Sequence, residues 1–169
     1  MDSITRALVL LLTACAAFAG CSKPSGTAPA RLAAPASPCE TLVLKTADVS
    51  GLLHAPITHA AALAGDGQSC AFLTAGFAGL TVSVRPGLGR ASLDAWSAGR
   101  MPLAVRPQPG VGDAAVWQDT LHEMIAQKND LLCDIQVRGG GEDIAIAVDA
   151  LPQALGVLCN RIFAAAQVH

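Results

Sequence analysis

Acid–base chemistry in this sequence would have to come from its histidines and the acidic residues near them. The histidines are His54, His59, His122 and His169. Asp119, His122 and Glu123 lie close together and could supply the acid and base of a hydrolase. His122 and Glu123 are adjacent, however, and adjacent side chains on a strand point to opposite faces of its sheet. His54 and His59 flank a proline-containing loop, and we expect no metal site there.

Other catalytic signatures are missing from the sequence. No serine lies in a Gly-x-Ser-x-Gly nucleophile elbow. The run Pro-Gly-Val-Gly-Asp at 109–113 has the glycines of a phosphate loop, but a strand pattern follows it where a helix should begin. We interpret this run as a tight turn in which Asp113 bonds the backbone, so that Asp113 matters for folding. We therefore expect no enzyme activity and no cofactor.

The cysteine with the clearest chemistry is Cys21. An uncharged run from Ala7 to Ala19 has the length of a signal-peptide apolar region and is too short to cross a bilayer. Phe-Ala-Gly-Cys at 18–21 then resembles the lipobox of bacterial lipoproteins, in which the cysteine is acylated after cleavage before it. Leu-Thr-Ala-Cys at 12–15 also fits a lipobox, but too few apolar residues precede Cys15. Cys21 is therefore the predicted lipid anchor.

Three regions follow from this interpretation: a signal peptide at 1–20, a lipidated Pro/Ala-rich tether at 21–38 and one domain at 39–169. The tether cannot bury enough apolar surface to fold, and it reaches up to about 50 Å. The domain is then extracytoplasmic and anchored to a membrane. Ser22, where an inner-membrane lipoprotein of Gram-negative bacteria often has Asp, favours the periplasmic face of the outer membrane.

Charge and composition exclude one large class of partner. The chain carries a net charge of only −2, and its Lys and Arg residues form no basic cluster. Nucleic-acid binding needs such a cluster. The expected contacts are the membrane, through the lipid, and an envelope protein or small ligand.

The domain alternates short helices with strands. A helix is predicted over 46–53 and strands over 70–75 and 80–85, followed by a helix from Ser92 to about Gly99. Three strands follow at about 114–118, 121–127 and 131–138, whereas 58–69 and 102–112 read as loops.

An apolar stripe at helical spacing from residue 144 onward predicts a long closing helix. Pro152 either kinks this helix or places its start near Asp149, and 144–148 could instead form a sixth strand. Tight turns join the strands. The predicted fold is α+β, with an antiparallel sheet of about five strands and helices packed on one face.

Four cysteines remain in the domain: Cys39, Cys70, Cys133 and Cys159. An even number in an exported protein predicts two disulfides, and three pairings are possible. We favour Cys133 with Cys159, because both point towards the interface between sheet and closing helix. We also favour Cys39 with Cys70, where a bridge would contribute about 3–4 kcal/mol.

Several short motifs together resemble a known group. A cysteine precedes the helix Thr46 to Leu53, a second cysteine opens a strand, and Pro-Gly-Val-Gly-Asp-Ala-Ala at 109–115 leads into another strand. This pattern is similar to uncharacterised bacterial lipoproteins related to the extracellular sensor domain of mycobacterial receptor serine/threonine kinases. The resemblance implies an extracytoplasmic α+β module that senses a ligand.

We therefore expect a non-enzymatic ligand-binding or protein-interaction module of the cell envelope, which binds through the exposed sheet face or the Gly/Pro loops. The alternatives are a structural envelope protein without a ligand and a hydrolase with an unrecognised site.

Overall fold

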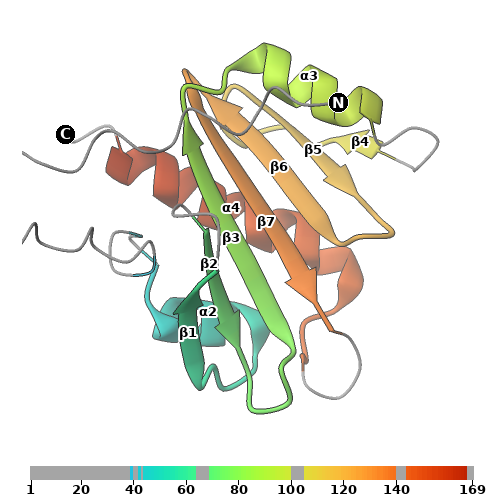
Figure 1. The fold of residues 1–169 in the computed structure, drawn as a ribbon. Helices are drawn as coiled ribbons and strands as arrows, with labels where there is room; N and C mark the ends of the chain where they lie inside the picture. Colours follow the sequence, from blue (N-terminus) through green and yellow to red (C-terminus); the bar gives the residue numbers. More distant parts are fainter. Residues whose placement is uncertain are drawn as a thin grey trace, which may run out of the picture. The chain divides into compact units, whose positions relative to one another are not determined.

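The fold is a single antiparallel sheet with helices on both faces (Figure 1). The computed structural model describes residues 39, 42, 44–63, 69–99, 105–139 and 144–166, and all of them belong to one compact unit. The sheet has seven strands in the order β1-β2-β3-β7-β6-β5-β4. The strands are β1 (His59–Ala62), β2 (Ser69–Leu73), β3 (Gly79–Pro86), β4 (Val105–Pro107), β5 (Ala114–Gln118), β6 (Glu123–Lys128) and β7 (Leu131–Arg138).

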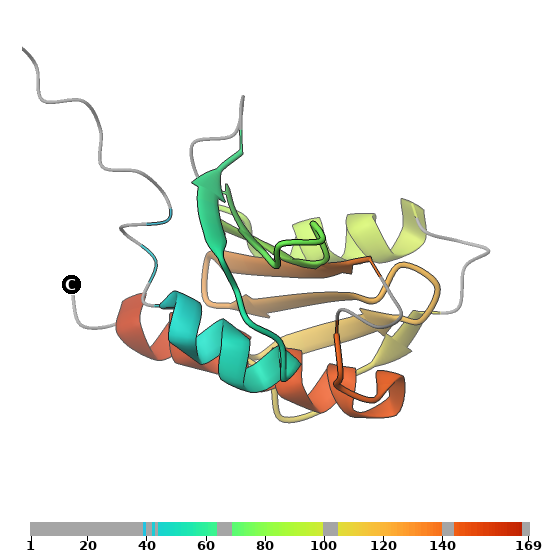
Figure 2. The same ribbon diagram turned by 90° about the horizontal axis from the view of Figure 1, so that it is seen from below.

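Three α-helices are present among the described residues, and they divide between the faces. Helices α2 (Thr46–Leu53) and α4 (Leu151–Ala166) lie on one side of the sheet, and α3 (Arg90–Gly99) lies on the other (Figure 2). We call these sides the α4 face and the α3 face. The prediction that the helices pack on one face is therefore wrong for α3. Its Leu93 packs with Ile125 and Leu132, which alternate along their strands with the residues that face α4.

The predicted number of about five strands is also too low. The two additional strands, β1 and β4, form the two edges of the sheet within segments predicted to be loops. All four residues of β1 are exposed, so β1 has no alternation of apolar and polar residues that could reveal it. Strand β4 has only three residues and ends in a proline. The coarser prediction, an α+β fold with an antiparallel sheet, is confirmed.

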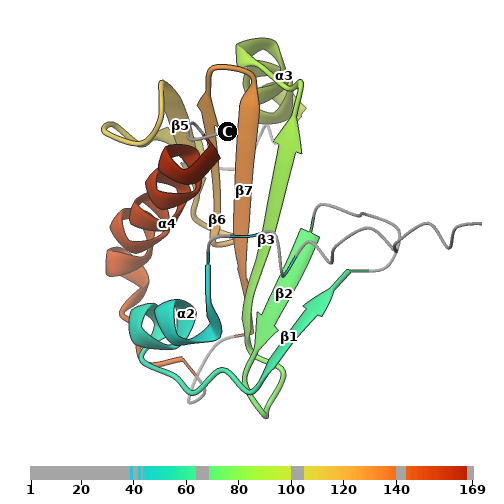
Figure 3. The same cartoon turned by 90° about the vertical axis from the view of Figure 1, so that its left-hand side faces the viewer.

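The main core lies between the sheet and the helices α2 and α4, which both lie on the same side of the sheet in Figure 3. Its largest side chains are fully buried and come from both layers: Phe72, Trp117, Met124, Leu155 and Phe163. Helix α4 begins at Leu151 after one turn of 3-10 helix, so Pro152 lies in its first turn, where no backbone N–H is missed. The later of the two predicted starts is thus confirmed, and the strand predicted as an alternative over 144–148 does not form.

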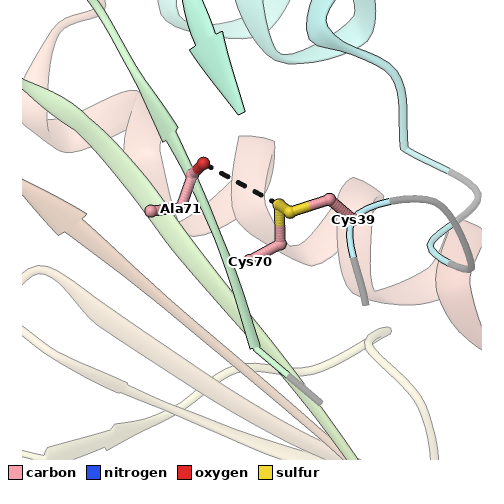
Figure 4. Close-up of a disulfide and its surroundings, with 3 residues drawn as sticks. All are labelled: Cys39, Cys70 and Ala71. Atoms are coloured by element: carbon pink, nitrogen blue, oxygen red, sulfur yellow. Dashed lines mark hydrogen bonds between the residues drawn. A yellow bond between two sulfur atoms is a disulfide. The ribbon is translucent and has the colours of Figure 1, made fainter. Parts of the chain in front are cut away.

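Two disulfides form with the pairings that the sequence favoured, and one of them joins the sheet to α4. Cys133 on β7 is bonded to Cys159 on α4, with 5.9 Å between their Cα atoms. Cys39 is bonded to Cys70 on β2, with a Cα separation of 5.1 Å (Figure 4). The Cys70 sulfur also lies 3.8 Å from the carbonyl oxygen of Ala71. Because a disulfide sulfur carries no hydrogen, this is a packing contact and not a hydrogen bond.

Candidate functional site

Of the three residues proposed for a hydrolase, the fold brings Asp119 and His122 together around Trp117 but leaves Glu123 apart. Asp119 accepts hydrogen bonds from the indole nitrogen of Trp117 at 2.7 Å and from the Arg106 guanidinium at 2.6 Å. The hydrogen bond from Arg106 is the main reason why the pKa of Asp119 lies below its usual range. His122 stacks on Trp117, with ring centroids 6.2 Å apart. Asp119 therefore has a structural role, as the acceptor that holds Trp117 and Arg106.

Glu123, the third member of that hypothesis, belongs to the other side of the sheet. It is opposite Gln118 on β5, whereas Trp117 is opposite Met124 and joins the core of the α4 face. Since neighbouring side chains alternate, Glu123 points to the α3 face, away from Trp117 and the ring stacked on it. Asp119, His122 and Glu123 thus do not form one cleft, and the geometry gives no support to a hydrolase that uses them.

The other two histidines in the described residues are also apart from any metal-binding set. His54 ends α2 with a φ of 51°, and His59 begins the exposed strand β1. No cluster of three His, Cys, Asp or Glu side chains that could hold a metal ion occurs within the described part of the chain. His169 lies outside the described residues.

Asp113 and the turn before it connect the sheet to α4 through hydrogen bonds. The Asp113 carboxylate accepts the backbone N–H of Asn129 at 2.8 Å and so fixes the turn between β6 and β7. The Asn160 side chain on α4 accepts the N–H of Gly112 and donates to the carbonyl of Gly110, both at 2.9 Å. A Cβ on Gly156 would lie 2.6 Å from Val111, so only glycine allows the turn to approach α4 this closely.

The predicted anchor Cys21, the competing Cys15 and the whole tether lie outside the described residues. In the part of the chain that the structure describes, no helix is long and apolar enough to cross a membrane.

A different candidate site emerges on the α3 face, because this face collects the buried polar side chains of the sheet. Seven buried polar residues occur in the described part of the chain, and all except Thr74 project from this face. They are Ser69, Thr81, Ser83, Gln118, Glu123 and Gln127. The α4 face is apolar at the corresponding strand positions.

Four of the polar residues on this face lie in register across neighbouring strands. Thr81 on β3 is opposite Gln136 on β7, which is opposite Glu123 on β6, which is opposite Gln118 on β5. Directly opposed side chains lie on the same face about 5 Å apart. We call Thr81, Gln136, Glu123 and Gln118 the polar row. It presents a hydroxyl, two amides and a carboxylate along one line across the sheet.

A second line of polar residues runs beside the polar row. Ser69, Ser83 and Asp134 are opposite one another on β2, β3 and β7, and the two serine hydroxyls are hydrogen-bonded. The line then becomes apolar at Ile125, where α3 covers the face. The hydrogen-bonding groups are therefore concentrated beside the end that α3 occupies.

Gln118 is the most constrained member of the polar row. It is fully buried, and its carbonyl oxygen accepts the backbone N–H of Leu121. Its amide nitrogen is buried and has no hydrogen-bond partner among the described residues. A buried donor without a partner costs about 1–3 kcal/mol, so this amide lowers the stability of the fold.

The same face also has a shallow groove at the end that α3 occupies. It has a volume of about 270 Å³ and lies between α3 and the segment from Pro107 to Val116. Arg90 and Asp94, which form an exposed ion pair at 2.9 Å, stand on its α3 side. The groove and the polar row are thus both parts of the α3 face.

The polar row could not be foreseen as a set. The sequence does show the alternation that places Thr81 and Gln136 on the polar faces of their strands, but only the strand register places them opposite each other. No protein-family model matches the chain, and no curated protein or solved structure does either. The resemblance to sensor-like lipoproteins stays a prediction.

Proposed function

We propose that this chain is a lipid-anchored, extracytoplasmic binding module whose α3 face contacts a ligand or partner protein of the cell envelope. The observation that carries the proposal is the concentration of buried polar side chains on that face, in line with one another. A sheet face that served only to pack would be apolar, as the α4 face is.

The location of the module rests on independent features. The sequence around Cys21 resembles a lipobox, and two disulfides are typical of proteins that fold in an oxidising compartment, which supports an extracytoplasmic location. Two or three acyl chains on one residue would hold the domain at the membrane, because each buried methylene contributes about 0.8 kcal/mol. The tether then lets the domain search a wide volume above the bilayer.

The binding face is tested with the double variant Thr81→Val and Gln136→Leu, compared with the wild type. Both substitutions preserve approximate size and remove hydrogen-bonding groups from the polar row. The matched control is the exposed pair Gln153→Leu and Ala164→Val on α4. We expect crosslinked envelopes or native mass spectrometry to show a partner or ligand with the wild type and the control, and its loss with the polar-row variant.

Equal capture by the polar-row variant would contradict the assignment of the face. Capture by none of the three proteins would favour a structural envelope protein that has no ligand. The anchor is tested separately: Cys21→Ser should abolish acylation and release the domain from membranes, and unchanged attachment would refute the lipid anchor.

A further inference from the structure

The outer edge of β1 is the second unusual surface of the domain. Its four residues are His59 followed by three alanines, and all are exposed. The N–H of Leu63 donates to the carbonyl of Ser69 on β2 at 3.1 Å, so the backbone groups of Leu63 point towards β2, into the sheet. Because antiparallel strands alternate inward and outward bonding, Ala61 also bonds inward, while Ala60 and Ala62 present their N–H and C=O groups outward.

The opposite edge of the sheet, strand β4, is protected against pairing with another strand. Strand β4 ends in Pro107, which has no N–H to offer, and its Arg106 is engaged by Asp119. Prolines and charged side chains are the usual means by which proteins prevent pairing at a sheet edge. Strand β1 has neither within His59–Ala62, although it is exposed on both sides.

We infer that β1 is a docking edge for β1 of a second copy of this chain, paired antiparallel around a two-fold axis at Ala61. In this register Ala60 of each copy is opposite Ala62 of the other. Both residues present their backbone groups outward, so the two pairs would exchange about four hydrogen bonds. The alanine side chains are small enough for the strands to reach ladder spacing without a clash.

The same register also covers an apolar side chain. Leu63 is a partly exposed large hydrophobic residue, with 37% of its surface accessible. Antiparallel pairing about Ala61 places Leu63 of one copy opposite His59 of the other, once at each end of the contact. The surface is therefore complementary to itself, as a two-fold contact requires.

The contact between the two β1 edges is too small to hold a dimer together in free solution. Stable dimers of freely diffusing proteins bury about 1,200–2,000 Å². A four-residue strand edge of small side chains is far below that, so free domains would pair only weakly. Membrane anchoring, which is part of the proposed function, raises the effective concentration of a second copy and makes a small contact sufficient.

The position of the tethers is compatible with two copies on one membrane. Each tether reaches the fold at Cys39, which is bonded to Cys70, and Cys70 is opposite Ala62 on β1. In the paired sheet the two Cys70 residues would be three strand spacings apart across the sheet and shifted by two residues along the strands. Their Cα atoms would then be about 16 Å apart. This is well within the tether's reach of about 50 Å.

Pairing of this kind also extends the proposed binding surface. A two-fold axis perpendicular to the sheet keeps the α3 faces of both copies on the same side. A ligand with repeated groups would then meet two polar rows on one continuous sheet, and two simultaneous contacts bind more tightly than one.

The test uses the full-length protein in membranes, with Ala61→Cys as the reporter. Two opposed, non-hydrogen-bonded residues have Cα atoms about 4.5 Å apart, within the range that a disulfide spans. Ala61 lies on the α3 face, away from the Cys39–Cys70 bridge. With copper–phenanthroline as oxidant, we expect at least about tenfold more crosslinked homodimer than with the control Ala98→Cys, an exposed site on α3. Equal crosslinking at the two sites would overturn the proposal.

A second pair of variants tests the edge itself in the Ala61→Cys background. Ala60→Lys with Ala62→Lys places like charges opposite each other across the axis and should reduce crosslinking to the level of the Ala98→Cys control. Gln153→Lys with Ala164→Lys adds the same charge on α4 and should leave it unchanged. Crosslinking that survives the β1 lysines would refute edge pairing.

Failure of this inference is distinguishable from failure of the proposed function. If the polar-row variant loses its ligand while Ala61→Cys still crosslinks, both proposals hold independently. If Ala61→Cys fails to crosslink but the ligand is captured through the α3 face, only the edge pairing is wrong. Release by Cys21→Ser should abolish crosslinking at equal bulk concentration, and persistence would show that membrane confinement is not what sustains the contact.

Discussion

The two faces of the sheet are built from the same strands, but they differ in the helices that cover them and in the polarity of their side chains. The α4 face is apolar, covered by two helices and joined to α4 by the Cys133–Cys159 bridge. The α3 face has one helix at one end, a small apolar cluster beneath it and polar side chains beside it. The comparison indicates that the stability of the domain comes mainly from the α4 face, and the proposed function assigns recognition to the α3 face.

The strongest test of this asymmetry compares two buried leucines. Leu155 on α4 and Leu93 on α3 are both buried, at 0% and 2% exposure, but only Leu155 lies in the large core. Leu-to-Ala substitutions cost about 2–5 kcal/mol, with the larger values where surrounding side chains cannot close the cavity. We expect Leu155→Ala near the upper end and Leu93→Ala near the lower end, measured by chemical denaturation. Equal losses would show that both faces stabilise the fold alike.

The two disulfides provide the next comparison. Their sequence separations are 26 and 31 residues, so loop closure alone predicts nearly equal stabilisation, about 3–4 kcal/mol each. The Cys133–Cys159 bridge also holds α4 against β7. We therefore expect the double variant Cys133→Ala and Cys159→Ala to lower the unfolding free energy more than Cys39→Ala and Cys70→Ala. If removing the Cys39–Cys70 bridge lowers the unfolding free energy more, the Cys133–Cys159 bridge contributes less to stability than its contact with α4 suggests.

A smaller effect on stability is expected from the polar row. Thr81→Val with Gln136→Leu should change the unfolding free energy by less than about 1 kcal/mol, because the loss of their polar groups is offset by added apolar burial. Thermal denaturation of this variant beside the wild type measures the change. A large loss would mean that the polar row stabilises the fold and would weaken its assignment to binding.

The smallest effect is expected at the margin of the α4 face, where Asp48 joins α2 to α4. Its carboxylate accepts the N–H of Lys45 at 2.9 Å and the Arg161 guanidinium at 2.8 Å. The hydrogen bond from Lys45, followed by that from Arg161, lowers the pKa of Asp48. A lowered pKa stabilises the fold above the ordinary range of aspartate, and this contribution is lost as the pH falls through the folded-state pKa.

Asp48→Asn should therefore be slightly less stable than the wild type at neutral pH, and the difference should close in acid. Denaturation curves of both proteins at several pH values measure this. A difference that stays constant with pH would show that the charge of Asp48 does not contribute.

Much of this architecture could be predicted because it depends on local patterns. Alternating residues from Leu131 to Arg138 identify β7, and the leucine stripe of α4 predicts its buried side. The pairing of Cys133 with Cys159 followed from the faces that they occupy, and that of Cys39 with Cys70 from their positions before the first helix and at the start of the first predicted strand. Strands β1 and β4 could not be predicted, because an exposed alanine strand and a three-residue strand carry no periodicity.

The polar row could not be predicted from the sequence either, because it depends on strand register. Thr81, Glu123 and Gln118 lie on separate strands, and the sequence pointed to Glu123 only as a partner of His122. Only long-range register assembles the three residues. The position of α3 has the same origin. Its apolar side is visible in the sequence, but the face on which it packs depends on which strand residues alternate beneath it.

The bridge between Cys39 and Cys70 has a mechanical consequence. Any tension applied on the N-terminal side of Cys39 passes through a covalent bond directly into β2, in the interior of the sheet. The intervening helix α2 and edge strand β1 lie within the loop that this bond closes, so they carry none of the load. In the lipid-anchored form that we propose, a pull from the membrane would enter the sheet at β2 and leave the exposed edge strand β1 without load.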